Sequence, residues 1–182
     1  YIDCNTLRAG YPEGKRASES LCQAYIQKYG IDVVIPRISR TFGPTMLLSD
    51  SKASSQFIMN AVHKENIVLK SAGTQLYSYA YVADIVSALL FLLVKGQKGE
   101  AYNVSNEHCD ITLRTFAETL ANVAGTKVIH GEATAQEKQG FSKATKALLD
   151  NQKIYALGWR PLYDSMEEPL KHTIKILEGS GN

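Results

Sequence analysis

A tyrosine and a lysine lie four residues apart near the start of this chain, in the segment YPEGK at residues 11–15. Residues with this spacing share one face of a helix, so the phenol of Tyr11 and the ammonium of Lys15 would be neighbours. A nearby positive charge stabilises a phenolate, which is the proton-accepting form of tyrosine. Tyr11 is therefore a candidate general base, with Lys15 as its activating partner. By itself the spacing favours a simpler interpretation, an exposed pair on a helix surface. The surrounding segments must therefore decide whether the pair is catalytic.

The segments that must position this pair alternate between helix and strand. Good helix formers predict a helix over residues 12–29, with Gly30 just after its end. The β-branched run at 31–39 predicts a buried parallel strand, in which Pro36 requires a bulge or an edge position. A turn at 41–44 (TFGP) is expected to close this strand.

The same alternation continues to the end of the chain. Helices are expected near 56–64, 85–94, 113–124, 151–157 and 165–177, and strands at 67–70, 101–105 and 127–131. Residues 132–146 are polar and weakly periodic, which predicts a loop with at most one short helix. Alternating helices and strands predict the α/β class.

The apolar run IVSALLFLLV at 85–94 is too short to cross a bilayer, which needs about 20 residues, and we expect it to form a buried helix. Asp84 precedes this run, and its side-chain oxygen is expected to cap the helix. Thr112 is expected to cap the helix at 113–124 in the same way, and Gly125 to end it.

Composition limits the classes of function. The chain has 182 residues, of which 45% are hydrophobic and 21% charged, as in a globular protein with a core. A net charge of +2 gives no basis for expecting nucleic-acid or membrane-surface binding. Cys4, Cys22 and Cys109 form no CxxC pattern and the four histidines share no metal-ligand spacing. We therefore assign no metal and no disulfide, and we expect a cytoplasmic protein.

Four segments in a fixed order give the tyrosine and lysine a context. They are YPEGKRASESLCQAYIQKYGIDVVIPRISRTFGP from residue 11, YSYAYVADIVSALLFLL from 77, GEAYNVSN from 99 and LGWRP from 157. Together they resemble the extended short-chain dehydrogenases, specifically the nucleotide-sugar epimerases, dehydratases and UDP-glucuronate decarboxylases, over essentially the whole chain. The resemblance implies the C-terminal portion of a Rossmann-like doubly wound sheet and a small α/β lid that binds the substrate.

The resemblance also implies a division of the chain. Residues 1–45 and 82–106 would belong to the dinucleotide-binding domain, and residues 46–81 and 107–182 to the substrate-binding region. Trp159 would pack in the protein interior rather than bind a ligand.

Individual residues acquire roles from the same resemblance. Tyr11 corresponds to the base that takes a proton from a sugar hydroxyl, and Lys15 to the residue that bonds the nicotinamide ribose of NAD. Pro36, Ile38 and Ser39 lie in the segment that the family places beside that ribose, so we expect them to contact the cofactor as well. For the neighbouring Arg37, a structural ion pair and a functional role are equally open.

Two residues depart from the family pattern. The family usually carries Asn at the position of Arg40, and Arg at the position of Tyr77, where it meets the pyrophosphate of the nucleotide-sugar. Arg40 can supply the charge that Tyr77 lacks, because a guanidinium binds phosphate oxygens from either position. A merely solvated Arg40 is the alternative. We assign Arg40, Tyr77 and Lys146 to substrate binding.

The implied activity is oxidation of a nucleotide-sugar at C4, with NAD as hydride acceptor, in the synthesis of surface polysaccharides. Epimerisation or dehydration would follow. A UDP-glucuronate decarboxylase-like enzyme is one alternative, and a non-catalytic protein of the same fold that senses a dinucleotide is the other.

The chain lacks parts that such an enzyme needs. No GxGxxG turn, which would hold the dinucleotide pyrophosphate, occurs in the sequence, and Tyr11 lies too near the first residue for the upstream Ser, Thr or Glu of the family to be present. We therefore expect a piece of a longer protein that is inactive by itself. The resemblance further implies a homodimer in which the Tyr11 helices pack together.

Overall fold

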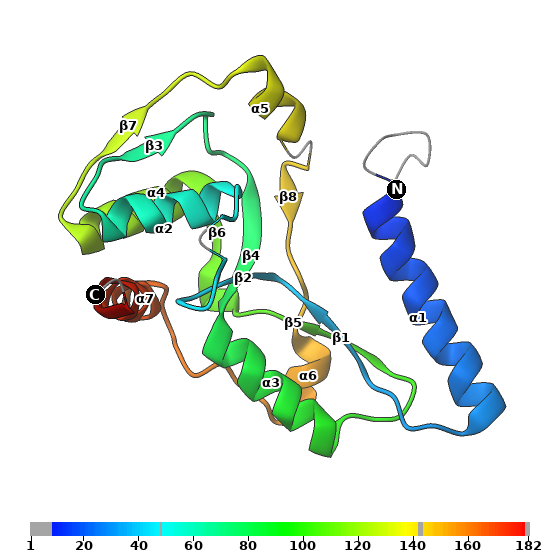
Figure 1. The fold of residues 1–182 in the computed structure, drawn as a ribbon. Helices are drawn as coiled ribbons and strands as arrows, with labels where there is room; N and C mark the ends of the chain where they lie inside the picture. The colour runs from blue at the N-terminus through cyan, green and yellow to red at the C-terminus, as the bar shows by residue number, and fades with distance from the viewer. Residues whose placement is uncertain (1–8, 48, 142–143, 181–182) are drawn as a thin grey trace.

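Helices and strands alternate along the chain, so the predicted α/β class is confirmed (Figure 1). The computed structural model describes residues 9–47, 49–141 and 144–180, and Cys4 lies outside these ranges. The helices are α1 (Gly10–Tyr29), α2 (Ala53–Val62), α3 (Val82–Lys95), η1 (Glu107–Cys109), α4 (Leu113–Ala124), α5 (Ala135–Gly140), α6 (Gln152–Ala156) and α7 (Glu167–Ser180). The strands are β1 (Ile35–Ile38), β2 (Arg40–Phe42), β3 (Ile67–Leu69), β4 (Leu76–Tyr81), β5 (Ala101–Val104), β6 (Asp110–Thr112), β7 (Val128–His130) and β8 (Lys146–Ala147).

In the part of the chain that the structure describes, the strands form three small sheets. β1 pairs with β5 and β3 pairs with β7, both in parallel. β4 lies between β2, which is parallel to it, and β6, which is antiparallel, and it also pairs with β8. In the described ranges β1 has β5 as its one neighbour, so Pro36 occupies the expected edge position. The N–H that proline lacks is not needed there for a hydrogen bond to a second strand.

The predicted turn at 41–44 is partly wrong. Thr41 and Phe42 belong to β2, because their backbone groups pair with β4, and the chain turns only at Gly43. Gly43 has a φ of 154°, and a Cβ there would lie 2.5 Å from a methyl carbon of Val82. The turn therefore requires glycine, and it brings the end of β2 against the start of α3.

The expectation that the apolar run at 85–94 is a buried helix is also wrong. One face of α3 is buried, through Ile85, Ala88 and Leu92. The opposite face is exposed, with Leu93 82% and Val94 76% accessible. Within the described ranges no element covers this second face, so the helix has one buried side rather than a buried surface all round.

Asp84 does not cap α3 as expected. The helix begins at Val82, and its N-cap, Tyr81, makes no side-chain cap bond. The carboxylate of Asp84 is fully buried and accepts hydrogen bonds from the Leu162 backbone N–H at 2.6 Å and from Asn106 Nδ2 at 3.1 Å. Burial raises the pKa of Asp84. Asp84 therefore links α3 to the segments around Asn106 and Leu162 instead of capping the helix.

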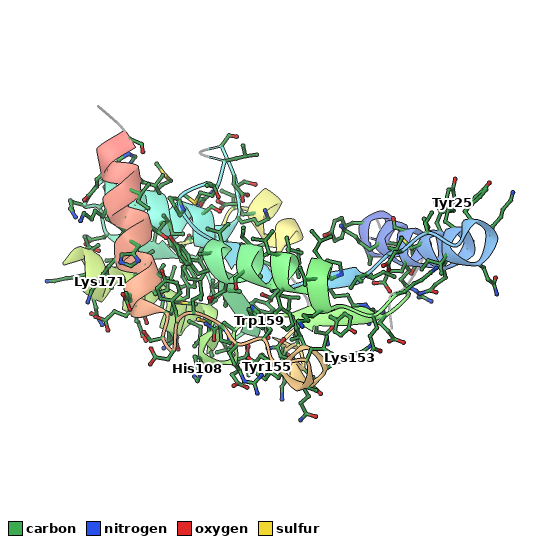
Figure 2. All side chains as sticks on the ribbon, turned by 90° about the horizontal axis from the view of Figure 1, so that it is seen from below. Tyr25, His108, Lys153, Tyr155, Trp159 and Lys171 are labelled. Carbon is green, nitrogen blue, oxygen red and sulfur yellow. The ribbon has the colours of Figure 1, made fainter. Side chains whose placement is uncertain are left out.

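Among the described residues, two hydrophobic clusters form the core. The larger one joins α2, α4 and α7 to β4, around Phe57, Phe116 and Leu170. The smaller one joins α3, β5 and α6, around Tyr102 and Trp159. The Trp159 ring is packed as expected and donates from Nε1 to Ser87 Oγ at 3.2 Å, beside Tyr155 (Figure 2).

Helix α1 lies apart from both clusters, as the position of Tyr25 in Figure 2 illustrates. None of its 20 residues is buried. It is attached through polar contacts, in which Arg37 donates two hydrogen bonds to Glu19 and Gln23 donates one to the Gly99 carbonyl. Arg37 is thus an ion-pair partner. Among the described residues, no helix is long and apolar enough to span a membrane.

Candidate functional site

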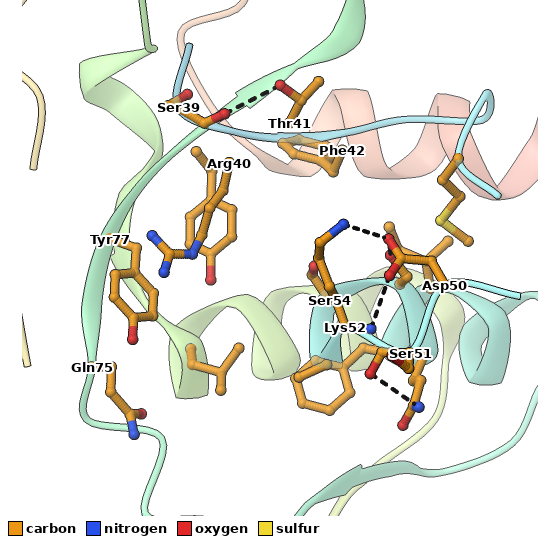
Figure 3. A pocket seen from close by; sticks show the side chains of 18 of the residues that line it. Ser39, Arg40, Thr41, Phe42, Asp50, Ser51, Lys52, Ser54, Gln75 and Tyr77 are labelled. Carbon is orange, nitrogen blue, oxygen red and sulfur yellow. Dashed lines mark hydrogen bonds and ion pairs between the residues drawn. The ribbon is translucent and has the colours of Figure 1, made fainter. Parts of the chain in front are cut away.

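A cavity of about 1230 Å³ opens where β1 ends and the chain crosses into β2 (Figure 3). β1 and β5 are parallel, so both end at this edge of their sheet, where ligands of α/β proteins characteristically bind. The start of α2, the end of β3, the first half of β4 and residues 147–149 complete the wall. No group of three or more potential metal ligands occurs in the described part of the chain.

Five of the eight predicted site residues line this cavity. They are Tyr11, Ile38, Ser39, Arg40 and Tyr77. Lys15, Pro36 and Lys146 do not line it. Lys146 lies on β8 opposite Leu76, one position before Ala147, which pairs with Tyr77.

Tyr11 and Lys15 are brought together by the first turns of α1. The Lys15 ammonium lies 5.6 Å from the centre of the Tyr11 ring, as their spacing on one helix face requires. The Tyr11 side chain is 76% exposed and reaches the rim of the cavity. The phenolate form of a tyrosine beside an ammonium at a cavity rim can take a proton from a ligand hydroxyl.

Two polar atoms in the cavity wall are buried without a partner. They are the hydroxyl of Ser39 and the carboxamide oxygen of Gln75, for which no hydrogen bond is found among the described residues. The Ser39 backbone is fixed, because its N–H donates to the Val104 carbonyl at 3.0 Å. Buried polar atoms normally have partners, so both atoms are available to a ligand.

Arg40 and Tyr77 lie against each other in the cavity wall (Figure 3). The guanidinium carbon of Arg40 lies 3.4 Å from the centre of the Tyr77 ring. Tyr77 is only 5% exposed, and its hydroxyl donates to the Ala144 carbonyl at 3.1 Å. On the same strand, burial raises the pKa of Tyr79 to about 12 despite the opposing effect of the Arg40 charge, so its phenol stays neutral at physiological pH.

The two lysines in the cavity wall have acidic partners. Lys52 lies 2.9 Å from Asp50 Oδ2, and Lys70 lies 2.6 Å from Glu137 Oε1. The hydrogen bond from Lys52 lowers the pKa of Asp50, and the hydrogen bond from Lys70 lowers the pKa of Glu137 to about 2. Both carboxylates are therefore charged at neutral pH, and each offsets the lysine beside it.

Sequence reasoning missed the contribution of Gln75 and of the residues before and within the first turns of α2. The serine-rich run at 49–55 was a usable signal, because polar residues that precede a helix gather their hydroxyls and amides at its N-terminus. Gln75 carried no such signal. It reaches the cavity because β4 passes beside β2, a pairing that the sequence pattern did not indicate.

Comparison with known proteins gives this site a context. The sequence pattern of the NAD dependent epimerase/dehydratase family matches residues 3–105. The UDP-glucuronic acid decarboxylase 1 of Xenopus tropicalis is 32% identical over 181 residues, which cover 96% of this chain and 41% of the relative. The chain thus spans less than half the length of that curated relative.

Solved structures share the fold. The UDP-glucose 4-epimerase of Thermotoga maritima, solved with UDP-glucose, superposes with a TM-score of 0.78 at 22% identity, covering 92% of this chain and 52% of the other. The dTDP-glucose 4,6-dehydratase of Bacillus anthracis, solved with NAD, gives a TM-score of 0.76 at 20% identity, covering 96% and 53%. The predicted Rossmann-like architecture is confirmed by these likenesses.

Proposed function

This chain belongs to the NAD dependent epimerase/dehydratase family, and from that we propose that it is part of an enzyme that oxidises a nucleotide-sugar at C4, with Tyr11 as the base. The observation that carries the proposal is the Tyr11 phenol beside the Lys15 ammonium at the rim of a cavity large enough for a nucleotide-sugar. Tyr11, as its phenolate, takes the proton of the C4 hydroxyl and becomes a neutral phenol, and the Lys15 ammonium beside it stabilises the phenolate before the transfer.

The residues present fit NAD as the cofactor. NAD supplies a hydride acceptor when it is bound. Lys15 and the unpartnered hydroxyl of Ser39 would hold its ribose, and Pro36 and Ile38 would pack against it from the end of β1. An ammonium can donate to ribose hydroxyls, and a serine hydroxyl can donate to them or accept from them, so both groups suit a ribose.

In this proposal the two regions of the chain bind different molecules. Residues 1–45 and 82–106 would serve the cofactor, and residues 46–81 and 107–182 the substrate. The smaller hydrophobic cluster joins Tyr102 of the first region to Ile154 and Trp159 of the second, so the two regions pack together. A homodimer through α1 is supported by the exposed apolar side chains of that helix, among them Leu21 and Tyr25. The cytoplasmic location stays a prediction.

Epimerisation or dehydration would complete the reaction. Loss of the sugar carboxylate is a second candidate, because the matched relative from Xenopus tropicalis is a UDP-glucuronic acid decarboxylase with 32% identity over 96% of this chain. The products distinguish the candidates, since they are an epimer, a keto-deoxy sugar or a pentose.

The first test replaces Tyr11 in the protein that contains this chain. Removing a positioned proton acceptor lowers the rate by about 100- to 10,000-fold, so Tyr11→Phe is expected to reduce kcat by that factor with UDP-glucuronate, UDP-glucose or dTDP-glucose as substrate. Tyr25→Phe, a change of the same size on the same helix but away from the cavity, is the matched control and keeps the wild-type kcat. A Tyr11→Phe variant with unchanged kcat would show that another group is the base.

A further inference from the structure

We propose that Arg40, held on the ring of Tyr77, binds the diphosphate of the nucleotide-sugar. The inference rests on the proposed function for its choice of ligand, and on the geometry of the cavity for its location. It names the residue that recognises the negative charge of the substrate.

Arg40 is the cavity cation whose charge is not offset. Lys52 and Lys70 each face a carboxylate, at 2.9 and 2.6 Å. Arg37, three residues earlier, is turned to Glu19 and does not line the cavity. Over the ranges that the structure describes, Arg40 forms no ion pair, and its guanidinium contacts an aromatic ring instead. A free guanidinium in a concave site is a strong attractor for a phosphate ester.

Tyr77 holds the guanidinium in place. Its ring is buried in the wall and its hydroxyl donates to the Ala144 carbonyl. The ring against which the guanidinium lies is therefore fixed in position. Stacking uses one face of the guanidinium and leaves its N–H groups free to donate in the plane. Arg40 is therefore oriented for a fork of two hydrogen bonds before any ligand arrives, and little side-chain entropy remains to be lost on binding.

One further atom in the cavity wall restricts the ligand. The carboxamide oxygen of Gln75 is buried without a partner among the described residues, and it can only accept a hydrogen bond. A ligand that satisfies Arg40 and Gln75 carries an anion and also a hydroxyl or N–H donor. A sugar or nucleoside linked through phosphate has this arrangement, whereas a free carboxylate or an apolar ligand does not.

The test measures binding by calorimetry with UDP as the probe and with inorganic pyrophosphate as the anion by itself. UDP is expected to bind the wild-type protein, and Arg40→Gln is expected to weaken that binding about 10- to 100-fold, the effect of losing charge-assisted hydrogen bonds. Arg40→Lys, which keeps the charge but loses the fork, is expected to fall between the two. Tyr77→Leu removes the ring on which the guanidinium lies and is expected to weaken UDP binding as well.

Arg37→Gln is the matched control, since it removes a guanidinium three residues away that faces Glu19. It leaves UDP affinity unchanged. Equal UDP affinity of Arg40→Gln and wild type overturns the inference, and so does an equal loss in Arg37→Gln or an absence of UDP binding to the folded wild-type protein. The proposed function fails separately: UDP binding that depends on Arg40 without turnover of any nucleotide-sugar contradicts the function, and turnover with a KM unchanged by Arg40→Gln contradicts the inference.

Discussion

At the scale of single residues, the spacing of side chains predicted their neighbours within one element but not between elements. Tyr11 and Lys15 meet because residues four apart share a helix face. Thr112 caps its helix as expected by accepting from the Thr115 N–H. Asp84 looked like a cap of the same kind. Its carboxylate instead accepts hydrogen bonds from Leu162 and Asn106, which are 78 and 22 residues away. A local sequence pattern does not predict partners at such distances.

Cys109 gives a prediction about pH at this scale. Burial of its thiol, which is 1% exposed, raises its pKa from 9.0 to about 12. Between these values the folded protein holds a proton that the unfolded chain has lost, so the thiol lowers the free energy of unfolding as the pH rises above 9.0. The expected loss is about 1 kcal/mol per pH unit.

Denaturant unfolding of wild type and Cys109→Ala measures this difference at about pH 8, below 9.0, and at about pH 11, between 9.0 and the raised pKa of about 12. The variant is expected to lose less stability over that range, and to retain a smaller alkaline loss from Tyr79, whose pKa is likewise raised by burial. Parallel pH curves for the two proteins would mean that the Cys109 thiol ionises as readily in the folded state as in the unfolded one.

At the scale of elements, periodicity predicted where most helices and strands lie but not which of their faces are covered. The apolar run at 85–94 correctly predicts a helix, yet only one side of α3 packs against the smaller cluster. β2 and β4 escaped prediction for a related reason. β2 is three residues long, and it is a strand because its backbone pairs with β4. That pairing depends on tertiary structure and leaves no periodic pattern in so short a segment.

Neighbouring leucines on α3 test this description. Leu92 is 2% exposed and Leu93 is 82% exposed. Leu92→Ala leaves a cavity in the smaller cluster and is expected to cost about 2–5 kcal/mol of the free energy of unfolding. Leu93→Ala is expected to change it by less than about 0.5 kcal/mol. Denaturant unfolding of both variants measures the two effects, and similar costs would show that the outer face of α3 is covered in the folded protein.

At the scale of the whole molecule, the cavity is assembled from pieces that are distant in the sequence. Five predicted residues reach it, because the family resemblance carries long-range information that composition and periodicity lack. Neither the family resemblance nor the periodicity of the sequence predicted that Arg40 stacks on Tyr77. The sequence indicated that both residues depart from the family pattern, and the pairing of β2 with β4, which places Arg40 opposite Tyr79, brings them together.

The proposed oxidation of a nucleotide-sugar at C4, with Tyr11 as the base, transfers a hydride from C4 to the cofactor. The most direct test uses a nucleotide-sugar with deuterium at C4, mixed with NAD and the protein that contains this chain, followed by rapid quenching and mass spectrometry of the cofactor. The wild-type protein is expected to give reduced cofactor that carries the deuterium, and the Tyr11→Phe variant is expected to give no labelled cofactor. Conversion of the sugar while the cofactor stays unlabelled and oxidised throughout would contradict the proposed oxidation.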